Sequence, residues 1–260
     1  MCGADLPLLE RPAPGSPRVN VQESAARYAF AASRVRSLTV LDVASGSGLG
    51  ADFLLAEGAE RVIGAERSTE ALRCARAYSA PSGPYFVQAD ALVLPFSDAA
   101  FDAVVSFETI EHLQDARGLI AEYRRILRPG GSLYLSTPNR TVTRWLPPNP
   151  FHVHEFTPLE VIELVGEHFT TVTCFWQRPV FFPTFVLRQV GRRWLTVVPG
   201  GETVWRLWQC IRPRRTQIGA ALWEGSHFDQ SLLQDAYYGV VPASRKRLVR
   251  PLYTVLVATC

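Results

Sequence analysis

The sequence predicts an α/β protein with a mostly parallel β-sheet and helices on both of its faces. Three observations predict this class. Short apolar segments alternate with helix-like segments from residue 38 to residue 136, and the first apolar segment ends in a glycine-rich turn. In addition, 47% of the 260 residues are hydrophobic and only 20% are charged. Parallel strands are apolar on both sides and need crossover helices, so this alternation indicates such a sheet.

The alternation identifies five strands and the helices between them. The expected strands are 38–43, 61–65, 85–88, 101–107 and 132–136, and the expected helices are 48–57, 68–79 and 116–127. An alanine-rich helix over 21–36 precedes the first strand, because its small apolar residues recur at helical spacing. The sequence RPGG at 128–131 ends the last helix, since proline and glycine both stop helices.

The regular alternation of strand and helix patterns ends after residue 138. We expect a proline-rich loop over 138–150, a helix over 158–168 and a strand over 170–176. Residues 178–247 do not continue the alternation, whereas 252–259 form an apolar segment expected to be an edge or closing strand of the same sheet. The predicted organisation is an N-terminal arm and helix (1–35), a core (36–178), a basic tryptophan-rich cap or insertion (179–247) and a closing strand (248–260).

The net charge of +3 is the sum of two regions of opposite sign. Residues 178–250 contain 12 basic and 4 acidic residues, a net +8, so the remainder carries −5. Tryptophans next to arginines can stack on bases or anionic rings. A cap packed on an acidic core has the same composition, and we favour that interpretation. A weak contact with a membrane surface is a further alternative.

Several protein classes are not expected. No apolar run approaches the ~20 residues of a membrane span. The expected features of a secretory signal, a basic start and then an apolar stretch, are not seen in the first residues. The five cysteines are odd in number and widely spaced, without a C-x-x-C pair. These features predict a reduced, cytoplasmic protein.

A cofactor-binding turn is expected after the first strand. The segment VLDVASGSGLG (40–50) places small residues between a strand and a helix, where backbone N–H groups can approach a ligand closely. Glu66 follows Gly46 by 20 residues at the end of the second strand, where a carboxylate can accept hydrogen bonds from ribose hydroxyls. Asp90 closes the third strand. The sequence has neither GxGxxG nor the Lys-Ser/Thr of a P-loop, which disfavours a dinucleotide enzyme.

A second group of chemically active side chains follows the fourth strand. FETIEHL (107–113) presents Glu108, Glu111 and His112 within five residues, at an edge where open α/β sheets bind ligands. Two carboxylates and an imidazole on one turn can converge on a cation. Further along, TPN (137–139) and HVHEFT (152–157) follow the fifth strand.

Together, the 42–48 turn, Glu66, Asp90, the RPGG turn and the terminal strand resemble class I S-adenosylmethionine-dependent methyltransferases. The resemblance covers about residues 20–178 and 250–260 and implies a Rossmann-like sheet of seven strands. Ala44 replaces the usual first glycine of the turn. We expect this change to be mild, since alanine fits most turn geometries except those with positive φ.

The resemblance also implies roles for individual residues. Gly46 and Gly48 would lie against the methionine part of the cofactor, Glu66 would bind the ribose, and Asp90 would meet the adenine amino group. Arg27 would bind the cofactor carboxylate, with a surface arginine as the alternative. The implied cofactor-binding residues are Arg27, Tyr28, Asp42, Ala44, Gly46, Gly48, Glu66, Arg67, Asp90, Ala91 and Phe107.

The pattern E-x-x-E-H, then TPN, then a histidine before an aromatic–Thr pair is similar to two metal-dependent families. These are the ubiquinone-biosynthesis O-methyltransferases and the small-RNA 3′-terminal 2′-O-methyltransferases. The match implies that Mg²⁺ or another divalent cation is held by four ligands: Glu108, Glu111, His112 and His152, with His154 as an alternative fourth. In many metal-free relatives the same Glu-His pair shapes the cofactor pocket and supplies a base, and this alternative stays open.

The expected function is methyl transfer from S-adenosylmethionine to a hydroxyl of a small-molecule acceptor, such as a vicinal diol, phenol or sugar of specialised metabolism. His112, Glu111 and His152 are the expected catalytic residues, because an alcohol needs a base or a metal to become nucleophilic. The acceptor itself could be anionic, given the basic insertion. One alternative is 2′-O-methylation of an RNA 3′ end, disfavoured because no RNA-binding module is appended. The other is cofactor binding with non-methylating chemistry. The sequence does not predict an oligomeric state.

Overall fold

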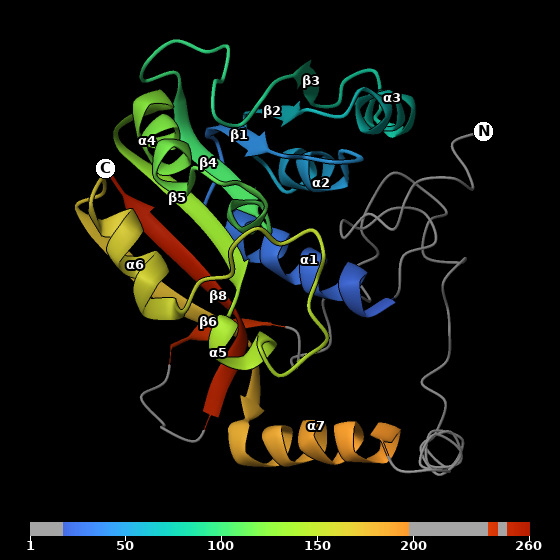
Figure 1. Ribbon diagram of the computed structural model, residues 1–260. Coiled ribbons are helices and arrows are strands. Elements are labelled where there is room, and N and C mark those ends of the chain that lie inside the picture. The colour runs from blue at the N-terminus through green and yellow to red at the C-terminus, as the bar shows by residue number, and fades with distance from the viewer. Residues whose placement is uncertain (1–17, 198–238, 244–248) are drawn as a thin grey trace.

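A single eight-stranded sheet forms the centre of the protein (Figure 1). The computed structural model describes residues 18–197, 239–243 and 249–260. The strands are β1 (Thr39–Val43), β2 (Arg61–Glu66), β3 (Tyr85–Gln88), β4 (Phe101–Phe107), β5 (Leu127–Pro138), β6 (Thr171–Phe181), β7 (Val240–Pro242) and β8 (Val249–Thr259). Their order is β3-β2-β1-β4-β5-β8-β6-β7. Strands β1 to β5 pair in parallel, whereas β8 runs antiparallel between β5 and β6.

Helices cover both faces of the sheet, as the sequence predicts. The helical elements are α1 (Arg18–Ala32), α2 (Leu49–Ala56), α3 (Thr69–Tyr78), η1 (Ile110–His112), α4 (Ala116–Ile126), α5 (Arg140–Thr143), α6 (Pro158–Gly166) and α7 (Phe182–Val197). Alternate residues of the central strands face opposite cores. Leu41 and Val104 pack with α4 and α6, while Val40 and Val105 pack with α1 and α2. Burial on both faces explains why these strands are continuously apolar.

The helices that follow β2 and β5 begin at local caps. Ser68 accepts a hydrogen bond from the N–H of Ala71 at the start of α3. At α6, Thr157 and Glu160 bond reciprocally to each other's backbone N–H groups and Pro158 occupies the first turn. Such caps satisfy N–H groups that have no partner within the helix. They fix where each connecting segment turns back toward the sheet.

The last strand differs from the sequence prediction. The sheet has eight strands instead of seven, because the short β7 pairs with β6 at one edge. The terminal strand β8 is not at an edge but lies inside the sheet. Its residues Val255 and Leu256 are fully buried, which requires neighbours on both sides and cover on both faces. The RPGG segment also lies within β5, so the strand begins earlier than expected.

The predicted insertion is only partly described. Strand β6 continues past the expected boundary at residue 178, and α7 follows it directly. The arm 1–17 and the segment 198–238, with Trp205, Trp208 and Trp223, lie outside the described residues. In the part of the chain that the structure describes, no helix is long and apolar enough to cross a membrane. Among the described cysteines, Cys174 and Cys260 are free thiols.

Candidate functional site

The turn between β1 and α2 is held in an unusual backbone conformation. Ala44, Gly46 and Gly48 all have positive φ angles, of 58°, 58° and 82°. A Cβ added to Gly48 would lie 2.6 Å from Cζ of Phe86, so only glycine fits there. The prediction that alanine at position 44 is a mild change is therefore wrong, because Ala44 occupies the left-handed region that disfavours a side chain.

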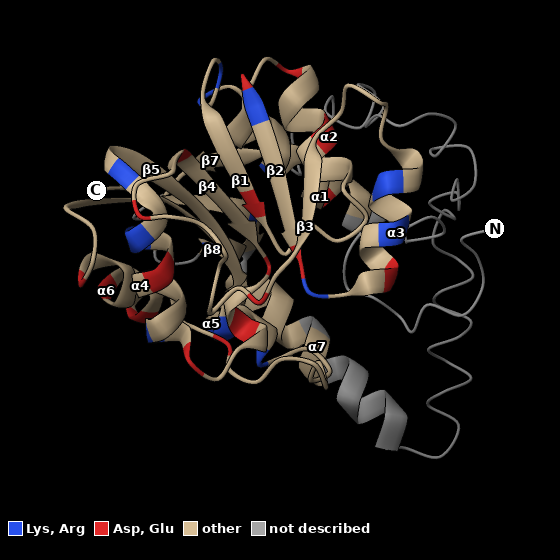
Figure 2. Ribbon diagram, turned by 90° about the horizontal axis from the view of Figure 1, so that it is seen from above, with Lys and Arg blue, Asp and Glu red and all other residues tan. Residues whose placement is uncertain are grey.

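Glu66 fixes the same turn from the end of β2. Its side-chain Oε2 accepts a hydrogen bond from the N–H of Gly46 at 3.0 Å, and Oε1 accepts one from the N–H of Ser68 at 2.9 Å. The neighbouring β1 ends near Asp42, whose carboxylate accepts the hydroxyl of Tyr28 at 3.0 and 3.1 Å. Both carboxylates are buried. Figure 2 shows acidic positions, in red, where β1 and β2 end.

A cavity of about 290 Å³ opens beside this turn. It is bounded by α1, the turn after β1, the end of β4, the loop between β5 and α6, and β8. The predicted site residues that line it are Arg27, Tyr28, Ala44, Gly46, Phe107, Glu108, Glu111 and His152. The structure thus brings together residues from four separate parts of the sequence at the carboxyl edge of the sheet, where open α/β folds bind ligands.

The other predicted cofactor residues lie around the cavity without lining it. Asp42, Gly48 and Glu66 support the turn from behind. Arg67 and Asp90 are exposed and Ala91 is half-buried, at the ends of β2 and β3. The strand ends are adjacent, since the N–H of Ala89 donates to the carbonyl of Glu66 at 3.1 Å. Contact of these residues with a cofactor remains a prediction.

Arg27 is not a surface arginine. Only 5% of it is exposed, and Nη1 donates to Oε1 of Gln177 at 2.7 Å. The guanidinium carbon lies 4.9 Å from the ring centroid of Tyr253, and its Nε has no hydrogen-bond partner. Gln177 in turn donates to the carbonyl of Glu23, whose carboxylate pairs with Arg178. A buried guanidinium with an unused donor faces the cavity from α1.

The two glutamates after β4 are held by hydroxyl groups from β5. Glu108 has a positive φ of 51°, and its Oε1 accepts the hydroxyl of Ser136 at 2.6 Å. Oε2 of Glu111 accepts the hydroxyl of Thr137 at 2.9 Å. Burial raises the pKa of both carboxyls, that of Glu111 well above its usual range. Glu111 is fully buried and its Oε1 has no hydrogen-bond partner.

Three of the four expected metal ligands come together. One potential ligand atom each from Glu111, His112 and His152 lies within 4.8 Å of the others. Glu108 is not part of this group. The alternative fourth ligand, His154, is exposed and packs its ring against Phe156, with centroids 4.5 Å apart.

The hydrogen bonds around the two histidines determine their tautomers. Oδ1 of Asn149 accepts the N–H of Phe151 at 3.0 Å, so the amide NH₂ faces Nε2 of His152, also at 3.0 Å. His152 therefore carries its proton on Nδ1, which donates to Oε1 of Glu155 at 2.6 Å. Nδ1 of His112 faces the carbonyl oxygen of Phe151 at 3.0 Å. Because a carbonyl only accepts, the lone pair of His112 is on Nε2.

Several lining residues were not predicted from the sequence. Glu155, Asn149 and Thr143 come from the loop after β5, and Thr143 donates its hydroxyl to Glu155. The H-x-H-E sequence could have pointed to Glu155, since a carboxylate three residues after a histidine often orients it. No local pattern points to Tyr253, which reaches the cavity only because β8 lies between β5 and β6.

The strand order, the glycine turn and the carboxylate at the end of β2 form a Rossmann-like arrangement. The family described as "Methyltransferase domain" matches residues 41–135. This segment contains the turn, Glu66, Asp90 and the Glu-x-x-Glu-His sequence. This match supports an S-adenosylmethionine-dependent methyltransferase domain over residues 41–135, with S-adenosylmethionine as its cofactor.

Relatives in sequence carry the same domain. A protein of Mycolicibacterium smegmatis named as a probable S-adenosylmethionine-dependent methyltransferase is 39% identical over 142 residues, covering 53% of this chain and 54% of that protein. A ubiquinone biosynthesis O-methyltransferase of Idiomarina loihiensis is 33% identical over 110 residues, covering 41% of this chain and 45% of the relative. The chain spans about half the length of the curated relatives that it matches.

Solved structures share the fold. A methyltransferase of Thermotoga maritima aligns with a TM-score of 0.55 and 15% identity, over 92% of this chain and 91% of that one. The [4+2]-cyclase SpnF aligns with a TM-score of 0.52 and 16% identity, over 92% and 81%. At these identities the likeness concerns the fold alone, and the same fold supports different chemistry.

Proposed function

We propose that the protein transfers the methyl group of S-adenosylmethionine to a hydroxyl oxygen of a small-molecule acceptor. The acceptor oxygen would bond to the methyl carbon while the carbon–sulfur bond breaks, with its electron pair remaining on sulfur. The proton of the hydroxyl has to leave during this step. The protein's task is to align the acceptor and to take up that proton.

One observation carries the proposal. Oε1 of Glu111 is fully buried and has no hydrogen-bond partner, yet Glu111 lines the cavity and belongs to the cluster with His112 and His152. An unsatisfied buried carboxylate oxygen costs free energy, which a bound cation or a donated hydrogen bond would recover. A site of this kind is suited to a hydroxyl-bearing acceptor.

The donor set fits a divalent cation. Glu111 and His112 offer one oxygen and one nitrogen ligand, and Nε2 of His152 would add a second nitrogen in exchange for its hydrogen bond with Asn149. This set is compatible with Mg²⁺, Mn²⁺, Zn²⁺ or Fe²⁺. A cation held there would lower the pKa of an acceptor hydroxyl and could hold a neighbouring oxygen. The similarity to ubiquinone biosynthesis O-methyltransferases supports transfer of the methyl group to an oxygen.

The protein's own groups would act as follows. His112, with its proton on Nδ1 and its lone pair on Nε2, would use that lone pair as a ligand of the cation or, where no cation is bound, as the base for the acceptor hydroxyl. Glu155 and Asn149 hold His152 in one orientation. The loop residues 143–155 cover the cavity on the acceptor side, so we expect them to contribute to acceptor choice.

The test is methyl transfer from labelled S-adenosylmethionine to a panel of catechols, vicinal diols and sugars. We expect label on oxygen, loss of activity with EDTA, and recovery with Mg²⁺ or Mn²⁺. His112→Ala should lower kcat by about 10²–10⁴. His154→Ala is the matched control, because His154 lies in the same loop but outside the cluster.

Four outcomes would contradict parts of the proposal. Label on nitrogen or carbon would exclude O-methylation, and label on the 3′ end of an RNA oligonucleotide would assign a nucleic-acid acceptor. If EDTA and Glu111→Gln both left the activity unchanged, the proposed role of a bound cation would be wrong. Binding of S-adenosylhomocysteine without methyl transfer to any acceptor would favour non-methylating chemistry.

A further inference from the structure

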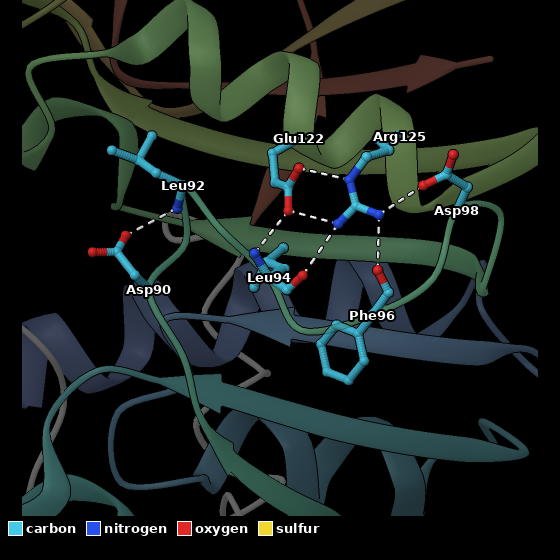
Figure 3. A network of polar contacts seen from close by, with 7 residues as sticks. All are labelled: Asp90, Leu92, Leu94, Phe96, Asp98, Glu122 and Arg125. Atoms are coloured by element: carbon cyan, nitrogen blue, oxygen red, sulfur yellow. Dashed lines mark hydrogen bonds and ion pairs between the residues drawn. The ribbon is translucent and has the colours of Figure 1, made fainter.

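The segment that connects β3 to β4 is fastened to α4 by one arginine. Figure 3 shows Arg125 lying between Glu122 of its own helix and the connecting segment. Its guanidinium donates to the carbonyl of Leu94 at 3.1 Å, to the carbonyl of Phe96 at 2.8 Å and to Oδ1 of Asp98 at 2.8 Å. A planar guanidinium with five N–H donors is suited to holding several acceptors at fixed positions.

Glu122 completes this arrangement. Both of its oxygens accept from Arg125, at 2.7 and 2.8 Å, and Oε1 also accepts the N–H of Leu94 at 2.7 Å. All five N–H groups of Arg125 are therefore used. The carbonyl of Arg125 accepts the N–H of Ala99 at 3.0 Å, so the helix holds the segment at both ends. We call Glu122 and Arg125 the α4 clamp.

The clamp begins where a tight turn ends. Asp90 forms this turn after β3: its Oδ1 accepts the N–H of Leu92 at 2.9 Å and its carbonyl accepts the N–H of Val93 at 3.1 Å. The β3 side of the turn is fixed, because Gln88 pairs with Glu66 in β2. The other side is fixed at Leu94, a buried core residue that the clamp contacts directly. The turn is thus held between the sheet and α4.

We propose that Glu122 and Arg125 are positioning residues for the cofactor's adenosine part, acting through the Asp90–Val93 turn. The turn lies at the carboxyl edge of the sheet, next to the end of β2. Asp90 and Val93 are exposed, with Val93 77% accessible, whereas Ala91 and Leu92 are half-buried against the core, so packing fixes only the middle of the turn. A ligand that binds to this turn gains affinity when the turn is already ordered, because less conformational entropy is lost on binding. This inference rests on cofactor binding and not on the acceptor proposed above.

Calorimetric titration with S-adenosylhomocysteine and with 5′-methylthioadenosine tests the inference. The second ligand keeps the adenosine part and lacks the amino-acid part. We expect Arg125→Gln and Glu122→Gln to weaken both ligands by the same factor, about tenfold. Arg125→Lys should recover only part of the loss, since an ammonium group cannot replace the guanidinium fork. The matched control is Arg124→Gln, since Arg124 is the adjacent half-buried arginine of α4 and lies outside the clamp.

Hydrogen exchange provides a second measurement. The amides of Leu94 and Ala99 should exchange faster in Arg125→Gln than in the control. If the clamp acted only on global stability, the variants would melt earlier but would keep wild-type Kd values well below the melting temperature, and the inference would be wrong. A loss confined to S-adenosylhomocysteine, or a wild-type protein that binds neither ligand, would also overturn it. Because only binding is measured, the result does not depend on whether methyl transfer is found.

Discussion

The carboxylate of Glu66 accepts a hydrogen bond from the backbone N–H of Gly46 at 3.0 Å. This contact joins the end of β2 to the turn after β1. Glu66 therefore has a structural role in addition to the expected contact with the ribose. One carboxylate is thus predicted to hold the cofactor and is seen to hold the turn that would surround it.

Glu66→Gln tests this dual task. A carboxylate accepts from both Gly46 and Ser68, whereas the NH₂ of an amide would face one of these N–H groups. We expect a loss of about 1–3 kcal/mol in the free energy of unfolding, together with weaker binding of S-adenosylhomocysteine. Denaturant unfolding and calorimetry would measure the two effects. Glu60→Gln, at an exposed position, should change neither, and an unchanged unfolding free energy for Glu66→Gln would contradict the structural task.

A pair of glycine substitutions separates backbone strain from steric overlap. Gly48 and Gly130 have similar φ angles, 82° and 79°, but an added Cβ meets Phe86 at the first and nothing within 4 Å at the second. Gly130→Ala should cost about 1–2 kcal/mol from strain alone. Gly48→Ala should cost roughly 1–3 kcal/mol more, because Phe86 must move. If thermal unfolding showed the same loss of stability for both variants, Phe86 would move aside without an energetic cost, and the predicted steric overlap would be wrong.

Ala44→Gly should stabilise the protein. The left-handed conformation, with a φ of 58°, destabilises alanine by roughly 1–2 kcal/mol. Glycine avoids this strain but loses about 0.5–1 kcal/mol more than alanine in backbone entropy on folding. The expected net gain in the free energy of unfolding is up to about 1.5 kcal/mol. The half-buried Ala89, which lacks a positive φ, serves as the control, since Ala89→Gly should destabilise. A loss at position 44 would mean that its Cβ makes a contact worth more than the strain.

Glu155→Gln should reduce turnover without weakening cofactor binding. The carboxylate accepts from both His152 and Thr143, and a single amide oxygen cannot keep both bonds in the same geometry. We expect kcat to fall about ten- to a hundredfold, with an unchanged Kd for S-adenosylhomocysteine. The exposed Glu163→Gln is the control. Parallel losses in kcat and cofactor affinity would indicate that the loop as a whole had moved.

The α4 clamp predicts a pH dependence of stability. Hydrogen bonds from Arg125 hold the pKa of Glu122 below its usual range. A lowered pKa means that the carboxylate stabilises the fold above its unfolded pKa, about 4.3, and that this contribution is lost as the pH falls through the lower folded value. The difference in unfolding free energy between wild type and Glu122→Gln should therefore be largest near pH 7 and shrink toward pH 3. A difference in unfolding free energy that did not change with pH would contradict this prediction.

Much of the fold follows from local sequence patterns. The alternation of apolar segments gives β1 to β4 nearly to the residue, because a buried parallel strand must be apolar on both faces. The FETIEHL and HVHEFT segments likewise identify Glu111, His112 and His152, because chemically active side chains cluster at strand ends. These predictions depend on neighbours within a few residues.

The sequence by itself determined the class of the sheet, the place of the glycine turn and most of the reactive side chains near the cavity. Only the tertiary structure decided that β8 lies between β5 and β6, that Tyr253 reaches the cavity while Gln177 bonds to Arg27, and that Glu108 and His154 stay outside the three-residue cluster. The physical reason is the same in each case. Strand order and the rotation of a side chain depend on contacts between segments up to a hundred or more residues apart, and no local pattern encodes them.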